Sequence, residues 1–311
     1  MHWGEDAASV FAKLDIAIEG GELTRLELGA SIQNGKRSLF VNGNKVASLS
    51  EFVGRLVCVT FSPTDLAIVK GSPSIRRKFV DKHLVDLHPL LIDDLLSFQR
   101  AISSKSSLLK AGVDDDAKLD SWDAVIAGSA ARIVNARREF LRALEKQAAL
   151  VLQHFAPGDA PLSLKLDSRL LSDEEGEVTP EQIIEKLRKY RAREVRYRSC
   201  LVGPHRDDVE ILLAGHDARA FASQGQARTA VLCLKLGVIK LLEDERRDRP
   251  VVLLDDVDSE LDAARVRALF EAVLAEPRQI FITGTGSKDE LPLAGQDVFS
   301  LKVEGGKLLS E

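Results

Sequence analysis

Short stretches of alternating hydrophobic and polar residues dominate the first 61 positions of the chain. Phe11–Glu19, Thr24–Ser31 and Arg37–Val41 alternate in part, and turns rich in glycine and asparagine separate them. The apolar, β-branched run Leu56–Phe61 follows and ends at a Ser-Pro pair. These patterns predict a sheet that is partly antiparallel.

The middle of the chain has the spacing of helices. Apolar residues recur at intervals of three and four over 73–155, with breaks near 112–116 and at Gly128. A short strand, Leu162–Leu166, and a second helix over 180–197 are expected next.

Strands and helices alternate in the last third of the chain. Val251–Leu254 and Gln279–Thr283 have the composition of buried strands, and helices are expected over 228–243 and 262–275. Such alternation favours a parallel sheet. We therefore expect an α/β fold whose body is divided by a mainly helical arm. The expected segments are 1–75 and 199–311 for the body and 76–198 for the arm.

Composition limits the classes of protein that remain. The chain has 311 residues, 45% of them hydrophobic, which is enough for a substantial core. No uncharged apolar run approaches the roughly 18 residues that a membrane helix needs. The N-terminus lacks the features of a signal peptide, and three scattered cysteines fit a reducing compartment. We expect a cytoplasmic protein that does not enter a membrane, and a net charge of −5 still permits a local basic face.

Two acidic residues, Asp255 and Asp256, follow the apolar run Val251–Leu254. Ligands of open α/β sheets bind at the carboxyl ends of the strands. One carboxylate there could hold Mg²⁺, and the other could orient or deprotonate a water molecule. Alternatively, the acids could belong to a polar turn before the next helix, for which Asp262 is a candidate N-cap. Taken alone, the pattern is weak and favours the polar turn.

A second candidate site is the small-residue segment that precedes an apolar helix. Ser223 could donate a hydroxyl hydrogen, Gly225 would allow an anion to approach closely, and a helix N-terminus presents free N–H groups. These properties would allow the segment to bind a phosphate. An ordinary helix start capped by Ser223 or Gln226 is an equally good interpretation.

The order of these motifs is similar to that of ABC-type ATPase heads. Ser223–Gln226 corresponds to the signature motif, Val251–Asp256 to Walker B and Ser259–Asp262 to the D-loop. Three further segments resemble those of the RecF recombination protein family, and the resemblance runs from about Trp3 to Gly306. These segments are Ser62–Asp81, Leu201–Asp208 and Gln279–Thr283.

The resemblance implies an SMC-like ATPase that dimerises on DNA when ATP is bound. RecF proteins act with RecO and RecR to load recombinase at single-strand gaps, in DNA replication, repair, recombination and the SOS response. Asp255 would then hold Mg²⁺ and Asp256 would act as the catalytic residue that poises water. The implied contacts to the nucleotide of the opposite subunit are Ser223, Gln224, Gly225 and Gln226, and the D-loop residues at the dimer seam are Ser259 and Asp262.

Two features depart from the ABC pattern. The P-loop, G-x-x-x-x-G-K-[ST], is missing, and the nearest match, Asn34–Ser38, has no Ser or Thr directly after Lys36. We therefore expect an N-terminally truncated chain that is inactive as an ATPase, and that binds ATP and Mg²⁺ only when the P-loop is restored. In addition, Thr283 stands near the position where ABC transporters place a histidine, so γ-phosphate sensing must differ.

The cations of 186–198 form a third candidate site, a DNA-binding surface. Seven Lys or Arg residues lie within this stretch, with Glu194 as the opposing charge. Binding to a phosphate backbone needs only a few such cations, although charge runs are often solvated helix faces. The cations that share one stripe of the predicted helix are Lys186, Lys189, Arg193 and Arg196.

The segment Gly203–Asp208 carries charged side chains before a predicted strand. His205 and Arg206 could sense a nucleotide or pair with the neighbouring aspartates. An ordinary polar turn is at least as good an interpretation.

The combined hypothesis is an ATP-gated DNA clamp that forms an ATP-dependent homodimer. Its partners would be double-stranded DNA, single-stranded or gapped DNA, and mediators of the RecO and RecR type. One alternative is a non-hydrolytic module that binds DNA or protein, because the P-loop is missing. A weaker alternative is a Mg²⁺-dependent phosphohydrolase that uses Asp255 and Asp256.

Overall fold

A computed structural model describes most of the chain, namely residues 7–17, 23–171, 176–246, 249–256, 261–285, 291–293, 295–304 and 307–310. The chain divides into two compact units, each built from segments that are distant in sequence. Unit 1 contains Met1–Leu56, Val80–Phe140 and Leu166–Asp208; unit 2 contains Val57–Phe79, Leu141–Lys165 and Val209–Glu311.

Unit 1 contains an antiparallel sheet built from the N-terminal residues. Its strands, in spatial order, are β1 (Ala7–Ala17), β2 (Leu23–Gln33), β3 (Lys36–Val41) and β4 (Asn44–Lys45). Asn34 and Gly35 have φ of 48° and 73°, as a tight two-residue hairpin requires. The turn residues and alternation therefore predicted this sheet correctly.

Unit 1 also contains the helices α3 (Leu91–Lys110) and α5 (Pro180–Tyr197) and the first part of α4 (Asp116–Phe155). The expected break near 112–116 is confirmed, but the one at Gly128 is wrong, because α4 runs through it. A glycine inside a helix costs only about 1 kcal/mol relative to alanine. The neighbouring side chains of Ile126 and Ala130 are fully buried, so the apolar face of the helix outweighs this cost.

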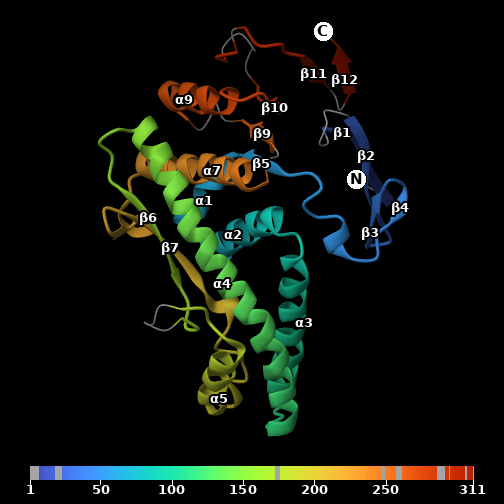
Figure 1. The fold of residues 1–311 in the computed structure, drawn as a ribbon, viewed down its shortest axis with the longest axis vertical. Coiled ribbons are helices and arrows are strands. Elements are labelled where there is room, and N and C mark those ends of the chain that lie inside the picture. Colours follow the sequence, from blue (N-terminus) through green and yellow to red (C-terminus); the bar gives the residue numbers. More distant parts are fainter. Residues whose placement is uncertain are drawn as a thin grey trace. The chain divides into compact units, whose positions relative to one another are not determined.

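Unit 2 contains a parallel sheet in the order β10 (Ile280–Thr283), β9 (Val251–Asp255) and β5 (Cys58–Phe61). Figure 1 shows α7 (Gln224–Arg246) and α9 (Ala263–Leu274) beside these strands. The expected parallel sheet is confirmed. The run ending at Phe61, however, joins this sheet and not the antiparallel one, because strand alternation does not specify the pairing partner.

Shorter elements complete the two units. Unit 1 includes η1 (Leu49–Glu51) and η3 (Pro204–Arg206), and the unit boundaries fall within α2 (Pro73–Leu87), α4, β6 (Leu162–Asp167) and β7 (Asp208–Leu213). Unit 2 includes η2 (Pro63–Leu66), α1 (Ala67–Lys70), β8 (His216–Asp217), α6 (Ala218–Phe221), β11 (Leu301–Glu304) and β12 (Lys307–Ser310). In the described part of the chain, no helix has both the length and the apolar character needed to span a membrane.

Candidate nucleotide and nucleic-acid sites

The parallel strands of unit 2 place the predicted metal ligand at the end of β9. Asp255 is the last residue of β9 and pairs in register with Thr283, the last residue of β10. The Thr283 hydroxyl donates to Oδ1 of Asp255 at 2.6 Å. The described residues contain no group of three or more His, Cys, Asp or Glu side chains that could hold a metal ion. A Mg²⁺ ion that is shared with substrate phosphates needs only one or two protein carboxylates, so Asp255 remains suitable.

Asp256, the predicted catalytic residue, has an unusual backbone conformation. Its φ is +50°, in the left-handed region that residues with a Cβ rarely adopt. Its N–H donates to the carbonyl of Thr283 at 3.0 Å, so the turn after β9 is fixed against β10. Strained residues of this kind often occur at functional sites.

The predicted phosphate-binding segment forms the first turn of α7, which begins at Gln224 and not at the expected residue 228. Ser223 and Gln226 form a reciprocal cap: Ser223 Oγ accepts from the Gln226 N–H at 3.2 Å, and Gln226 Oε1 accepts from the Ser223 N–H at 2.9 Å. The capped-helix interpretation is therefore confirmed. It leaves the N–H groups of Gln224 and Gly225 without a partner among the described residues. A phosphate could still bind to these two donors.

Gly225 is not required by the packing of this chain. A Cβ at this position would lie 3.4 Å from Nη2 of Arg265 and 4.0 Å from Oγ of Ser223, which is ordinary contact. Glycine in a helix is destabilising, so its presence here needs another explanation. One explanation is that a ligand approaches the backbone closely at Gly225.

Arg265 connects this turn to the start of α9. Asp262 caps α9 by accepting the Arg265 N–H at 2.9 Å, as predicted, and this hydrogen bond lowers the pKa of the Asp262 carboxyl. The Arg265 guanidinium pairs with Asp262 and also donates to Thr229 Oγ1 at 3.1 Å and to the Gly225 carbonyl at 3.3 Å. The predicted D-loop residue Ser259 lies outside the described residues.

Lys70 holds the chain that leads into the same turn. Its ammonium donates to the carbonyls of Ala218 at 3.0 Å, Arg219 at 3.2 Å and Ala222 at 2.5 Å. Ala222 directly precedes Ser223. Sequence reasoning missed this contact, although Lys70 lies inside the segment that resembles RecF proteins.

Sequence reasoning also missed a buried cation on α7. Lys235 is 5% exposed, pairs with Asp65, and donates to the carbonyl of Thr60 at the end of β5. It also lies 5.6 Å from the ring centre of Phe61. A lysine within an apolar helical run was the available signal, because a buried ammonium requires a partner.

The predicted DNA-binding cations differ in their exposure and in their hydrogen-bond partners. Lys186 donates to three carbonyls in the segment after β6, at 2.9 to 3.0 Å. Lys189, Arg193 and Arg196 are exposed. Arg193 lies over the ring of Tyr190. The exposed surface is therefore narrower than the predicted stripe, and we call these three residues the α5 cation patch.

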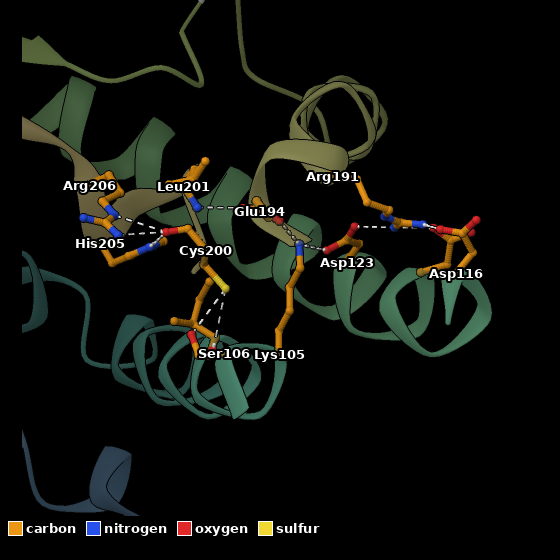
Figure 2. A network of polar contacts seen from close by, with 12 residues as sticks. Lys105, Ser106, Asp116, Asp123, Arg191, Glu194, Cys200, Leu201, His205 and Arg206 are labelled. Atoms are coloured by element: carbon orange, nitrogen blue, oxygen red, sulfur yellow. Dashed lines mark hydrogen bonds and ion pairs between the residues drawn. The ribbon is translucent and has the colours of Figure 1, made fainter. Parts of the chain in front are cut away.

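The opposite side of α5 is held by a buried ionic network (Figure 2). Arg191 pairs with three aspartates of α4, including Asp123 at 2.7 Å. Lys105 of α3 pairs with Asp123 and with Glu194, both at 2.6 Å, and Lys105 and Glu194 are at most 1% exposed. Burial opposes the charge of Lys105, but the two carboxylates raise its pKa above the ordinary value. The network therefore fixes α5 to α3 and α4, and with it the cation patch.

The segment Gly203–Asp208 is held by contacts within unit 1. His205 and Arg206 both bind the carbonyl of Cys200, at 3.3 Å and at 3.0 to 3.2 Å (Figure 2). Asp207 is 1% exposed and pairs with Arg137 at 2.9 Å. These contacts favour the structural interpretation of the segment over a nucleotide sensor.

Comparison with known proteins identifies the family. No protein-family model matches the chain. The DNA replication and repair protein RecF of Streptococcus pyogenes serotype M5 is 36% identical over 307 residues, covering 98% of this chain and 81% of the relative. This chain belongs to the RecF family. RecF of Caldanaerobacter subterraneus subsp. tengcongensis is 35% identical over 269 residues, covering 85% of this chain and 73% of that protein.

A solved RecF structure confirms the fold. The structure of the recombination mediator protein RecF-ATP in the RecFOR pathway matches with a TM-score of 0.87 and 31% identity, over 99% of this chain and 81% of that one. The α/β fold with long helical segments is therefore the RecF fold. The RecF relatives named here are longer than this chain.

Proposed function

We propose that this chain functions as a RecF-type recombination mediator with an ABC/SMC-like head and a helical arm. ATP bound between two copies closes a homodimer over DNA, and the closed dimer acts with mediators of the RecO and RecR type to help load recombinase at single-strand gaps. Hydrolysis of ATP reopens the dimer.

The observation that carries this proposal is the first turn of α7. Ser223 and Gln226 satisfy each other, and the N–H groups of Gln224 and Gly225 point from the positive end of a long helix. Gly225 has no packing reason to be glycine. A nucleotide phosphate from a second copy would explain both features.

The acidic end of β9 suits the metal that accompanies ATP. Asp255 would hold Mg²⁺ with one oxygen while Thr283 binds the other, and Asp256 would orient the attacking water. Bound Mg²⁺ would neutralise charge on the phosphates during their transfer. The Lys of a P-loop would have to come from outside these 311 residues, which contain no G-x-x-x-x-G-K-[ST] sequence. That observation favours the second candidate function, a non-hydrolytic module that binds DNA or protein.

The α5 cation patch is the proposed DNA contact. Its three cations are exposed and lie on a helix that the buried network holds in place. Contacts to phosphates release counterions, so each contact steepens the fall of affinity with salt by about 0.9 in a double-logarithmic plot.

The test is fluorescence anisotropy with a gapped duplex at about 50 to 200 mM NaCl. The triple variant K189A/R193A/R196A should bind more weakly, and its salt slope should be smaller by about 2 to 3. A matched control removes three exposed cations of the antiparallel sheet: Lys36, Arg37 and Lys45. Equal slopes for both triple variants would refute the assignment of the patch. No DNA binding with Mg·ATP, even by a chain preceded by a RecF-type P-loop unit, would refute the clamp.

ATP binding is tested separately in an extended chain, defined as this chain preceded by a RecF-type P-loop unit. Sedimentation should show dimers with Mg·ATP and monomers without it. If the extended chain binds DNA but remains monomeric with bound ATP, the non-hydrolytic module is the better description.

A further inference from the structure

Two cations bind backbone carbonyls at the start of α7, one just before its first turn and one within it. We propose that Lys70 and Arg265 are positioning residues that fix this turn so that the N–H groups of Gln224 and Gly225 can meet the nucleotide of a second copy. The inference rests on the proposed function for its ligand, but its structural part can be tested without nucleotide.

Lys70 fixes the chain immediately before the turn. The last carbonyls of a helix have no partner within that helix, and α6 is a single turn whose end at Phe221 leads directly to Ala222 and Ser223. The Lys70 ammonium donates to the carbonyls of Ala218, Arg219 and Ala222. An ammonium has three N–H donors, so these contacts use all of them. Lys70 can therefore act on a phosphate only through the backbone that it holds.

Arg265 fixes the chain within the turn. Its guanidinium donates to the Gly225 carbonyl at 3.3 Å and to Thr229 Oγ1 at 3.1 Å, and Thr229 itself donates to the Gly225 carbonyl at 3.1 Å. The ion pair with Asp262 orients the guanidinium. The planar guanidinium presents its donors in a fixed fork that meets these groups at once, and the single nitrogen of a lysine does not reproduce that geometry.

The two contacts fix peptide planes on both sides of the proposed donors. Lys70 holds the peptide between Ala222 and Ser223, and Arg265 holds the peptide between Gly225 and Gln226. Since each peptide unit is planar, the residues between them have little freedom to rotate. Donors that are fixed before binding do not lose conformational entropy when a phosphate arrives.

The two cations come from different helices of unit 2. Lys70 is the last residue of α1, and Arg265 lies in the first turn of α9. The orientation of the turn therefore depends on both helices. A shift of either helix would change how the turn meets a second copy.

The structural test is hydrogen–deuterium exchange of the 311-residue chain. In K70M and R265Q, the hydrogen-bonded amides of Ala222, Ser223, Gln226 and Ala227 should exchange at least 10-fold faster, whereas those of β9 should be unchanged. K70R should restore protection, and R265K should not, because it lacks the fork. The matched control is K240M, which removes an exposed α7 cation that pairs with Glu243. Exchange in K70M and R265Q equal to that of K240M would overturn the proposal.

The functional test uses the extended chain with Mg·ATP. K70M and R265Q should leave the ATP affinity of each monomer unchanged and raise the dimer dissociation constant about 10-fold, or about 1.4 kcal/mol. K70R should restore dimerisation. Unchanged dimerisation in both variants would overturn the role toward nucleotide. If the wild-type extended chain fails to dimerise, the proposed function fails, and the exchange experiment still decides whether the two cations position the turn.

Discussion

The Thr283 hydroxyl donates to Asp255 Oδ1 across two neighbouring parallel strands, at a distance of 2.6 Å. Both residues end their strands, so the contact lies at the edge where α/β sheets bind ligands. Binding one carboxylate oxygen orients the other, as outer hydrogen bonds do at many metal centres.

Replacing Thr283 by valine should raise the Mg²⁺ concentration that ATP turnover requires. The variant keeps the branched shape but loses the donor, so the Mg²⁺ concentration for half-maximal ATP turnover by the extended chain should rise about 10-fold. Thr283→Ser keeps the hydroxyl and serves as the control. An equal Mg²⁺ requirement in the valine variant and the wild type would show that the hydroxyl does not support a metal ligand.

The two aspartates should differ in their roles. Asp256→Asn in the extended chain should preserve ATP binding and dimerisation and reduce turnover by about 100-fold or more, because an amide is a poor general base. Asp255→Asn should also weaken the binding of Mg²⁺. Both are measured by phosphate release and by nucleotide titration. Normal hydrolysis by the Asp256→Asn variant would contradict the assignment of Asp256.

Ser223 should act between subunits. In the extended chain, Ser223→Arg should allow each monomer to bind ATP but block the closed dimer, because a bulky cation would occupy the place of the phosphate. Ser223→Ala is the control for the helix cap, because loss of the cap alone lowers the free energy of unfolding by about 1 kcal/mol. Sedimentation with Mg·ATP measures the outcome. A full population of dimer in the arginine variant would exclude the turn from the dimer seam.

Cys233 should make the stability of the chain depend on alkaline pH. Burial raises the pKa of its thiol from 9.0 to about 12. The folded chain then keeps a proton that the unfolded chain loses, so the free energy of unfolding falls as the pH rises through this window, by up to about 1.4 kcal/mol per pH unit. Urea unfolding should show a shallower decline in Cys233→Ala. Parallel pH profiles for the two chains would mean that the thiol titrates normally.

Local chemistry predicted the features that depend on residues close in sequence. The hairpin at Asn34 and Gly35, the cap of α9 by Asp262 and the cap of α7 by Ser223 each follow from a short pattern. The parallel strands ending at Asp255 and Thr283 were also predicted, because apolar runs and their order constrain an α/β sheet.

Contacts between distant residues could not be predicted in the same way. Lys70 and Arg265 look like surface cations in sequence, and their partners include backbone carbonyls, which every residue carries. The apolar run around Lys235 indicated burial but not that its partners would be Asp65 and the carbonyl of Thr60. The cation stripe of α5 shows that helical spacing does not reveal which of its cations have partners in the fold. Helical spacing placed Lys186 beside Lys189, but the fold brings carbonyls to Lys186 and none of these to Lys189.

The left-handed backbone at Asp256 places this position under two opposing selective pressures. Its φ of +50° costs a residue with a Cβ about 1 kcal/mol relative to glycine, although aspartate tolerates the conformation better than most. A library of variants screened only for thermal stability should therefore accumulate glycine at this position. The selected proteins would keep the fold and lose the carboxylate, so a laboratory lineage could become more robust while its chemistry disappeared.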